Sequence, residues 1–369
     1  MSDLYIGLMS GTSLDGIDGV LADFSGPRMR VSHHASAPFA PALRAELLAL
    51  NTPGDNELHR AALAGNALSR AYAEVVQTLL QRSGLPASAI RALGAHGQTV
   101  RHRPQEFDGT GYTLQLLSPA LLAERTGITV VADLRSRDVA AGGQGAPLVP
   151  AFHQGVFGRP GETVLVLNIG GISNLSVLGA DGSVLGFDCG PGNALMDHWC
   201  QLHTGQPFDR DGAWAATGQL LPGLLASLMQ EHFLHKPPPK STGRDLFNPP
   251  WLATHLERFG SAAPADVQAT LTEFTATACS ACADSYKIDS KILAVCGGGA
   301  LNTQLMRRLQ ALCPALQVVA TDALGLPALQ VEAAAFAWLS RQALHQAPGN
   351  LPSVTGAAGT RVLGAVYPA

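Results

Sequence analysis

The sequence predicts an α/β fold that is built from two related halves. One observation is a pattern of strand, glycine-bearing loop, strand, turn and strand that begins near residue 4 and recurs near residue 164. A second is the alternation of short apolar runs with longer segments of helical periodicity. A third is the length of 369 residues, which leaves room for roughly two domains of about 150 residues each.

The first half is expected to open as a β-meander and to continue with helices. Apolar runs predict strands at residues 4–6, 19–24, 28–35 and 92–95. Apolar residues at helical spacing predict helices at 43–50 and 57–82. Several of these strands end in polar, glycine-bearing segments, so we expect ligand-binding groups at the strand ends.

The second half is expected to repeat this order of strands. Predicted strands lie at 164–168, 175–178, 184–187, 291–295 and, in the tail of the chain, 361–366. One predicted helix begins at Ala194, and three more are predicted at 264–286, 302–312 and 330–345. Prolines and lysines cluster at 236–250, which indicates a surface loop or hinge.

Composition limits the classes of protein to consider. Hydrophobic residues make up 46% of the chain and charged residues 14%, so we expect a compact protein with a sizeable core. A net charge of −4 without a basic patch argues against nucleic acid or an anionic membrane as partner. The chain begins without a signal-like segment and its apolar runs are too short to cross a bilayer, so we expect a cytoplasmic protein.

The six cysteines do not form a recognisable metal pattern. Cys279 and Cys282 form a C-x-x-C pair, which could serve redox or metal chemistry. However, the pair lies within a predicted helix, and no second such pair or histidine pair completes a zinc site. We therefore expect all six to be small hydrophobic residues or buried thiols in a reducing compartment.

The loop after the first strand offers groups that hold phosphate. It supplies backbone amides and hydroxyl side chains from Ser10, Gly11, Thr12, Ser13 and Gly16. Asp15 and Asp18 stand near them, which suits a Mg²⁺ ion between phosphate and carboxylate. The loop lacks the ending of a Walker loop and the glycine spacing of a dinucleotide fingerprint, and an ordinary turn is the alternative.

Later segments extend this chemistry. Residues 170–174 form a second loop rich in amides and hydroxyls, and three glycines at 297–299 let the backbone approach a flat ligand at a strand-to-helix junction. Asp188 ends a predicted strand, where a carboxylate could project into a cleft as a catalytic base. A cap or turn aspartate before Gly190 is an equally good interpretation.

Together, these segments resemble the anhydro-N-acetylmuramic acid kinase family, a branch of the actin, sugar kinase and heat-shock ATPase superfamily. The resemblance spans the whole chain and is carried by residues 7–18, 95–99, 132–147, 168–174, 187–197, 297–302 and 364–368. Leu134 and Cys189 depart from the family pattern, which has an aromatic residue and a small hydroxyl residue there. The charged and glycine positions are intact.

The resemblance implies a fold of two ribonuclease-H-like, actin-like ATPase domains, each a mixed sheet flanked by helices, with an interdomain cleft. It predicts a first half at residues 1–130 plus 347–369 and a second half, carrying the adenosine loop, at 131–346. It also implies ATP and Mg²⁺ as cofactors and a homodimer as the assembly.

The activity that the resemblance implies is an ATP-dependent kinase that opens 1,6-anhydro-N-acetylmuramic acid with water and phosphorylates O6. The products would be N-acetylmuramic acid 6-phosphate and ADP, within the recycling of cell-wall murein. Two alternatives stay open. A kinase for another sugar or carboxylic acid would need no activated water, and an ATP-driven binding or filament protein would need no sugar acceptor.

The resemblance assigns catalysis to two carboxylates. Asp188 would be the base that activates water, and Glu332 would help to orient that water. Glu332 is also compatible with an ordinary solvated glutamate on a helix. The chemistry would be similar to inverting glycoside hydrolysis, with phosphoryl transfer neutralising the leaving group in place of a protein acid.

Nucleotide and sugar contacts are expected from two further groups of residues. Those expected at the nucleotide are Gly11, Thr12, Ser13, Leu14, Asp15, Gly16, Ile17, Asp18, Gly170, Gly171, Ser173, Gly297, Gly298 and Gly299, with Asp15 or Asp18 at Mg²⁺. Those expected at the sugar are Gln98, Thr99, Arg135, Arg137, Asp138 and Gln144, of which the arginines suit the lactyl carboxylate. A surface salt bridge among Arg135, Arg137 and Asp138 is the alternative. His96 is expected to be a structural histidine.

Overall fold

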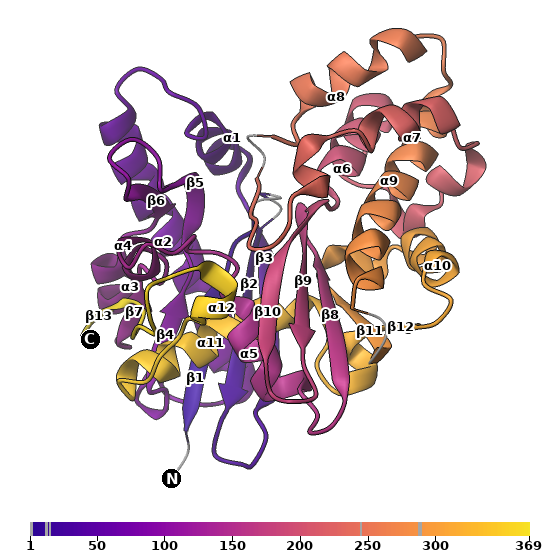
Figure 1. Cartoon of the computed structure of the whole chain (residues 1–369). Coiled ribbons are helices and arrows are strands. Elements are labelled where there is room, and N and C mark those ends of the chain that lie inside the picture. The colour runs from indigo at the N-terminus through magenta and orange to yellow at the C-terminus, as the bar shows by residue number, and fades with distance from the viewer. Residues whose placement is uncertain (1–2, 12–13, 15, 244–245, 287–289) are drawn as a thin grey trace. The chain divides into compact units, whose positions relative to one another are not determined.

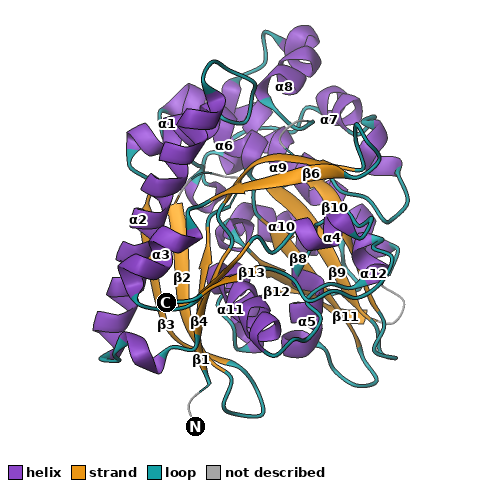
Figure 2. Ribbon diagram, turned by 90° about the vertical axis from the view of Figure 1, so that its left-hand side faces the viewer, coloured by secondary structure: helices purple, strands orange, loops and turns teal. Residues whose placement is uncertain are grey.

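The computed structural model describes the chain except for residues 1–2, 12–13, 15, 244–245 and 287–289. The chain divides into two compact units, which are Met1–Val156 with Gln330–Ala369 (unit 1) and Phe157–Leu329 (unit 2). Each unit contains a mixed β-sheet with helices beside it (Figures 1 and 2). Within the described ranges, no helix combines the length and apolar character needed to cross a bilayer.

The sheet of unit 1 has the strand order β13-β7-β4-β1-β2-β3. Its strands are β1 (Leu4–Met9), β2 (Gly16–Asp23), β3 (Arg30–Pro38), β4 (Ala92–Ala95), β7 (Val130–Ala132) and β13 (Ala365–Tyr367). A separate hairpin is formed by β5 (Gln98–Pro104) and β6 (Gly111–Leu116). The helices are α1 (Pro41–Ala49), α2 (Glu57–Ser83), α3 (Pro119–Thr126), α4 (Ser136–Ala140), α5 (Val149–Phe157), α11 (Val331–Leu344) and α12 (Pro352–Thr355).

The sheet of unit 2 has the strand order β10-β9-β8-β11-β12. Its strands are β8 (Thr163–Ile169), β9 (Ile172–Leu178), β10 (Val184–Pro191), β11 (Ser290–Cys296) and β12 (Gln317–Ala320). The helices are α6 (Ala194–Thr204), α7 (Pro222–Leu228), α8 (Pro249–Leu256), α9 (Pro264–Asp284) and α10 (Thr303–Leu312). The short turn η4 (His232–His235) precedes the segment 236–250.

The two sheets share one topology. In unit 1, β1, β2 and β3 form an antiparallel meander, and β4 and β7 follow parallel to β1. In unit 2, β8, β9 and β10 form the same meander, and β11 and β12 follow parallel to β8. This confirms the predicted repeat. It also brings the ends of β1 and β4, and those of β8, β10 and β11, to one edge of their own sheet.

The boundaries between the units differ from the predicted ones. Segment 131–156 and helix α11 belong to unit 1, because β7 pairs with β4 and α11 packs on β1 and β4. Two glycines permit this packing: a Cβ on Gly7 would lie 1.8 Å from Ala333 O, and one on Gly94 would lie 1.9 Å from Phe336 O. Periodicity predicts the helix but does not show which sheet it covers.

The other face of the unit 1 sheet is covered by α2. Ile6 and Ile17 of the sheet pack in one apolar cluster with Leu68 and Tyr72 of the helix. The equivalent cluster in unit 2 joins Leu167 of β8 to side chains of α9 such as Phe274. Each sheet therefore has its own hydrophobic core, which is the main source of stability for each unit.

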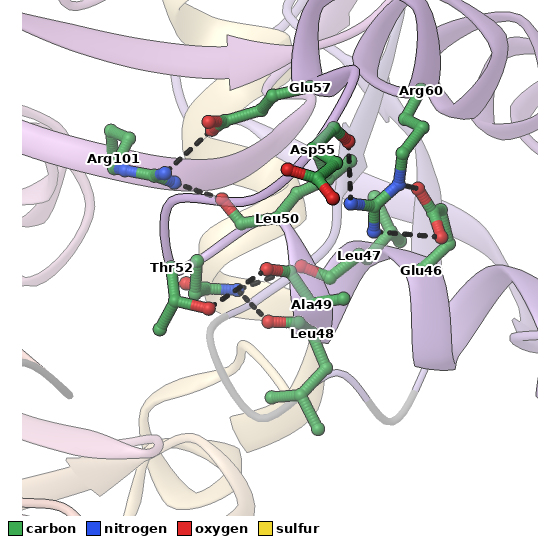
Figure 3. Close-up of polar contacts among 11 residues, drawn as sticks. Glu46, Leu47, Leu48, Ala49, Leu50, Thr52, Asp55, Glu57, Arg60 and Arg101 are labelled. Atoms are coloured by element: carbon green, nitrogen blue, oxygen red, sulfur yellow. Dashed lines mark hydrogen bonds and ion pairs between the residues drawn. The ribbon is translucent and has the colours of Figure 1, made fainter.

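Two ion pairs hold the connection between α1 and α2 (Figure 3). Arg60 Nε donates to Glu46 Oε1 at 2.7 Å, and Arg101 Nη2 donates to Glu57 Oε1 at 2.6 Å. Arg101 also donates to the carbonyl oxygen of Leu50. Because Arg101 lies on β5, these contacts tie the β5–β6 hairpin to the helical layer, and the first residues of β5 belong to the candidate site.

The predicted surface loop or hinge at 236–250 is partly wrong. Lys240 and Phe247 are buried, with 8% and 1% of their surfaces exposed. The carbonyl of Lys240 accepts a hydrogen bond from the backbone N–H of Asp188 at 3.0 Å. This part of the segment therefore packs against β10, and proline and lysine content alone did not reveal that.

Candidate active site

The loop after β1 is held in place by side chains from other elements. Gln98 Nε2 donates to Gly11 O at 3.1 Å, and Arg44 Nε donates to Leu14 O at 2.9 Å. Leu14 is buried and has a positive φ of 57°. The hydroxyl of Ser10 donates to Gly97 O at 3.0 Å, so it faces the protein interior. Thr12, Ser13 and Asp15, which are predicted nucleotide contacts, lie outside the described residues.

The next predicted contacts, Gly16, Ile17 and Asp18, are residues of β2. A Cβ on Gly16 would lie 2.4 Å from Ala37 O, so this glycine permits close pairing with β3. The side chain of Ile17 is buried in the core. The carboxylate of Asp18 is 41% exposed, and its Oδ1 lies 3.1 Å from His34 Nε2. Of these three residues, only Asp18 has a side chain that is accessible to a ligand or a metal ion.

His96 links the first loop to Arg135. Arg135 Nε donates to His96 Nε2 at 3.0 Å, and His96 Nδ1 lies 3.2 Å from Ser10 O. Since a guanidinium can only donate, we assign the proton of His96 to Nδ1, which donates to Ser10 O. Burial and then the positive charge of Arg135 hold the pKa of His96 well below its ordinary value. His96 is therefore neutral, as expected of a structural histidine, and it orients Arg135.

Asp138 organises the loop that follows α4. Its Oδ2 accepts from Gly145 N at 2.8 Å, and its Oδ1 accepts from Asn350 Nδ2 at 2.6 Å and Thr355 Oγ1 at 2.7 Å. The residue is fully buried. The Asp138 carboxylate therefore binds groups of the protein itself, whereas the sequence pattern led us to expect it at the sugar. Asn350 and Thr355 were missed by sequence reasoning, because they lie more than two hundred residues along the chain.

The structure separates Arg135 from Arg137. Arg135 Nη1 donates to Gly145 O at 2.8 Å, so this guanidinium spans His96 and the loop after α4. Arg137 is exposed on α4, where it lines a cavity of about 310 Å³ together with Asp133 and residues of the chain end. Two arginines that stand two positions apart in the sequence thus lie in different surroundings.

Gln98 presents an unused acceptor. Its side chain is 1% exposed, and its Oε1 has no hydrogen-bond partner among the described residues. A buried amide oxygen without a partner is costly, so it is a candidate to bind a ligand hydroxyl or amide.

Two other predicted sugar contacts, Thr99 and Gln144, make hydrogen bonds within the protein. Thr99 accepts at Oγ1 from Gln115 Nε2 at 3.1 Å. The backbone N–H of Gln144 donates to Thr355 O at 2.8 Å, which fastens the other side of the loop.

His102 is a further residue that sequence reasoning missed. Its Nδ1 lies 2.9 Å from Thr113 Oγ1 within the β5–β6 hairpin. Burial, and then the charge of Arg135, lower its pKa to about 4. Its position between two arginines in the sequence gives no signal of burial. Two neutral histidines therefore lie near the guanidinium of Arg135.

In unit 2, the turn between β8 and β9 consists of Gly170 and Gly171. Its carbonyls accept from the residues at the start of α6: Asn193 N donates to Gly170 O at 2.7 Å, and Gly192 N donates to Gly171 O at 3.0 Å. Among described residues, a Cβ on Gly170 would have no neighbour closer than 3.7 Å. The hydroxyl of Ser173 donates to Gly190 O at 3.1 Å, so this predicted phosphate ligand has a structural role through its side chain.

The glycines after β11 lie against this turn. A Cβ on Gly297 would lie 2.5 Å from Asn168 Oδ1, and one on Gly299 would lie 2.4 Å from Ile169 Cγ2. Gly297 also has a φ of 78°, which favours glycine. Gly298 is exposed beside Asn193. The structure thus brings two predicted nucleotide segments together at one edge of the unit 2 sheet, with an accessible backbone.

Asp188 lies at the same edge, next to a β-bulge in β10. The register of β10 against β9 shifts between Asp188 and Gly190, so Cys189 is the extra residue. Asp188 is 7% exposed, and its Oδ2 accepts from Thr242 N at 2.9 Å. Its backbone N–H bonds to Lys240 O. Two contacts with one segment therefore position this carboxylate.

Glu332 lies in the other unit. It is partly buried in the first turn of α11. Ala333 lies against Gly7, and Arg341 Nε donates to Asp3 Oδ2 at 2.7 Å. Hence α11 runs antiparallel to β1, and the first turn of α11, with Glu332, lies toward the end of the sheet where β1 leads into its loop. Across the described residues, no three histidine, cysteine or acidic side chains are grouped to hold a metal ion.

Comparison with known proteins identifies a matching family and several similar proteins. The family profile described as "Anhydro-N-acetylmuramic acid kinase" matches residues 3–369. The protein of that name from Variovorax paradoxus (strain S110) is 68% identical, over 100% of this chain and 99% of that protein. The one from Albidiferax ferrireducens is 63% identical over 100% of both. A solved ROK family glucokinase from Streptomyces griseus is 14% identical with a TM-score of 0.43, over 92% of this chain and 99% of that one.

Proposed function

The chain belongs to the anhydro-N-acetylmuramic acid kinase family and is a kinase of that sugar, and on this premise we propose how its residues carry out the reaction. The reaction transfers the γ-phosphoryl group of ATP to O6 while water attacks C1 and the C1–O6 bond breaks. It yields N-acetylmuramic acid 6-phosphate and ADP in murein recycling. The observation that carries the proposal is the buried Asp188 carboxylate at the same edge of the unit 2 sheet as the accessible backbone of Gly170 and Gly298.

The nucleotide is proposed to bind at the glycine segments. The accessible backbone at Gly170 and Gly298 suits phosphates and a flat adenosine, because amides bind phosphate oxygens without a side chain in the way. The loop at Gly11 would supply amides from the other half. Phosphoryl transfer depends on positioning and charge neutralisation, so contacts that position the phosphates would supply most of the catalysis of this step.

Mg²⁺ is proposed as the second cofactor, held mainly by phosphate oxygens and water. The half-exposed carboxylate of Asp18 fits such a partial role, since Mg²⁺ in kinases commonly takes only one or two protein carboxylates. Asp15 is the alternative ligand. When bound, the ion neutralises negative charge on the phosphates.

The sugar is proposed to bind at unit 1. Arg135, oriented by His96 and Gly145, offers its guanidinium to the lactyl carboxylate, and Gln98 Oε1 offers an acceptor to a hydroxyl or to the acetamido N–H. The neutral state of His96 leaves Arg135 as the positive charge of this pair. A carboxylate-bearing sugar therefore fits this edge better than a neutral one.

Asp188 is proposed as the general base. Its carboxylate would accept the proton of water as the water attacks C1, while Glu332 from α11 helps to hold that water. Water attacks from the face opposite O6, as in inverting glycosidases. The phosphoryl group takes over the negative charge of the leaving oxygen, so no protein acid is needed at O6.

An isotope experiment tests this proposal. Purified protein is incubated with MgATP, the anhydro sugar and ¹⁸O-water, and the product is analysed by mass spectrometry. We expect one ¹⁸O at C1 of the sugar and none in the phosphate. An unlabelled product, corrected for exchange at the reducing end with a preformed sugar phosphate control, would show that water does not open the ring.

We propose that the protein is a homodimer. Analytical ultracentrifugation tests this by comparing the mass of the particle in solution with the 38.3 kDa mass of one chain.

We also propose a cytoplasmic location, because ATP and the recycled sugar would be available there. A fractionation of the producing cells with the activity in the membrane or periplasmic fraction would contradict it.

A further inference from the structure

A cavity in unit 2 lies beside the strand that carries Asp188 and has no part in the proposed reaction. It has a volume of about 280 Å³, and its walls include Phe187, Leu234, Lys236, Lys240, Cys282 and Tyr286. Of the six cysteines, Cys282 alone is partly exposed, and the other five are buried. The cavity is therefore a route by which a small molecule reaches one particular thiol.

Two buried thiols stand behind Cys282. Cys189 and Cys279 lie in one apolar cluster, against which Cys282 packs, and the Cys189 thiol interacts with both of the other thiols. Cys189 is 1% exposed, and it is the extra residue of the bulge in β10. A bulge redirects a side chain, and here it places a thiol of β10 against α9. One end of this thiol cluster thus faces the cavity, and the other is joined through the backbone to Asp188.

Lys240 supplies a positive charge to the same cavity. Its Nζ donates to Leu234 O at 3.1 Å and lies 4.9 Å from the centre of the Phe233 ring. The hydrogen bond from Cys189, together with the charge of Lys240, holds the pKa of Cys282 below its ordinary value, although burial opposes this. Burial raises the pKa of Cys189. Since the thiolate is the reactive form, Cys282 is the nucleophile of the pair.

We propose that Cys282 is an oxidation site for small hydroperoxides, and that Cys189 resolves the oxidised form into a disulfide between α9 and β10. The thiolate sulfur of Cys282 attacks the terminal oxygen of the hydroperoxide, the O–O bond breaks, and an alcohol, or water from H₂O₂, leaves with a proton. Cys189 then loses its proton, its sulfur attacks the sulfenic acid, and water leaves. Two electrons pass from the two thiols to the hydroperoxide.

The expected consequence is reversible loss of kinase activity. Forming the S–S bond draws the two sulfurs closer than a thiol contact and displaces Cys189 in the bulge. Asp188 is the preceding residue, and it depends on Lys240 and Thr242 for its position. A shift of about 1 Å at a reacting group costs about 100-fold in rate. This consequence rests on the proposed role of Asp188, whereas disulfide formation does not.

Peptide mapping of the full-length protein tests the proposal. After exposure to increasing H₂O₂ and blocking of free thiols, mass spectrometry without reduction should show a peptide that links Cys189 to Cys282. Activity should fall by about 100-fold at full conversion and return with dithiothreitol. In Cys189→Ser, dimedone should label Cys282, because the sulfenic acid is no longer resolved.

Matched variants decide the assignment. Cys282→Ser should keep its activity under the same exposure, whereas Cys200→Ser, which changes a buried thiol bonded to Thr204, should lose activity as the wild type does. Oxidation of other cysteines before Cys282, or equal inactivation of Cys282→Ser, would overturn the site. A disulfide that forms without loss of activity would overturn the consequence for catalysis, whereas the mapped disulfide itself tests the oxidation site independently of whether Asp188 is the base.

Discussion

The edges of the two sheets at which ligands are proposed to bind have the same topology and are built by different means. In unit 2, the edge is made of backbone: the glycine segment at Gly297 packs so closely on the end of β8 that a Cβ on Gly297 would collide with Asn168. In unit 1, the edge is held by side chains, with Gln98 and His96 bonded to the first loop. We propose that the backbone surface of unit 2 binds phosphate, whereas side chains such as that of Arg135 in unit 1 recognise the sugar.

This difference predicts which residues determine the affinity for the sugar and which determine the affinity for ATP. Changes at Arg135 in unit 1 should alter the affinity for the sugar and leave the affinity for ATP. Changes at the glycines of unit 2 should alter ATP binding and stability. Asp188 lies at the backbone edge yet is proposed to act on the sugar, so it provides the strictest test of the comparison.

The largest expected effect is that of Asp188→Asn. The amide keeps the shape of the side chain but cannot accept the proton of water, so kcat should fall by about 10² to 10⁴. Steady-state kinetics measure the loss, and calorimetric titration with a non-hydrolysable ATP analogue should give an affinity within a few-fold of wild type. Turnover close to that of the wild type would remove Asp188 as the base.

A smaller effect is expected for Arg135→Ala. Loss of hydrogen bonds to a charged group costs about 1.5–3 kcal/mol, so KM for the sugar should rise by roughly 10- to 100-fold while KM for ATP changes little. Arg137→Ala should raise KM for the sugar by less than about threefold, because this side chain is exposed at a separate cavity. Equal losses in the two variants would instead favour the arginine pair expected from the sequence pattern.

Gly299→Ala tests the backbone edge. The new Cβ would lie 2.4 Å from Ile169 Cγ2, and overpacking of this kind costs about 1–3 kcal/mol. We expect a lower free energy of unfolding in urea and weaker ATP binding. Gly260→Ala in the same unit is the control, because a Cβ there would meet no described atom within 4 Å. Equal stability of the two variants would contradict the close packing.

The smallest effect is a difference in acid sensitivity between the units. His102 and His153 of unit 1 have pKa values lowered to about 4 and about 3, in both cases chiefly by burial. Below their ordinary pKa of 6.5, the unfolded chain binds protons that the folded chain does not. The free energy of unfolding therefore has its full value above pH 6.5, and it decreases as the pH falls toward the pKa values of the two histidines in the folded state.

The expected slope is about 1.4 kcal/mol per pH unit for each buried histidine over that range. Urea unfolding at several pH values measures it, and His102→Gln should remove one histidine's share of the slope. Hydrogen exchange at pH 5 should show unit 1 opening before unit 2. Protection that falls first in unit 2 would contradict the assignment.

The sequence by itself determined the local features of this protein. Strand positions such as 164–168, the helix at 330–345, the repeated order of strands and the glycine segments all follow from periodicity and backbone freedom. The kinase family follows from ordered motifs along the whole chain. These features depend on neighbours in the sequence, and short-range sterics and hydrophobic patterning are sufficient to predict them.

Only the tertiary structure decided which groups meet. It joined Asp138 to Asn350 and Thr355, directed Arg135 and Arg137 apart, and turned the hydroxyl of Ser173 to a structural role. It also assigned α11 to the sheet of β1 and β4. The physical reason is that a buried polar group takes whichever partner the fold brings within hydrogen-bonding distance, and that partner can lie anywhere along the chain.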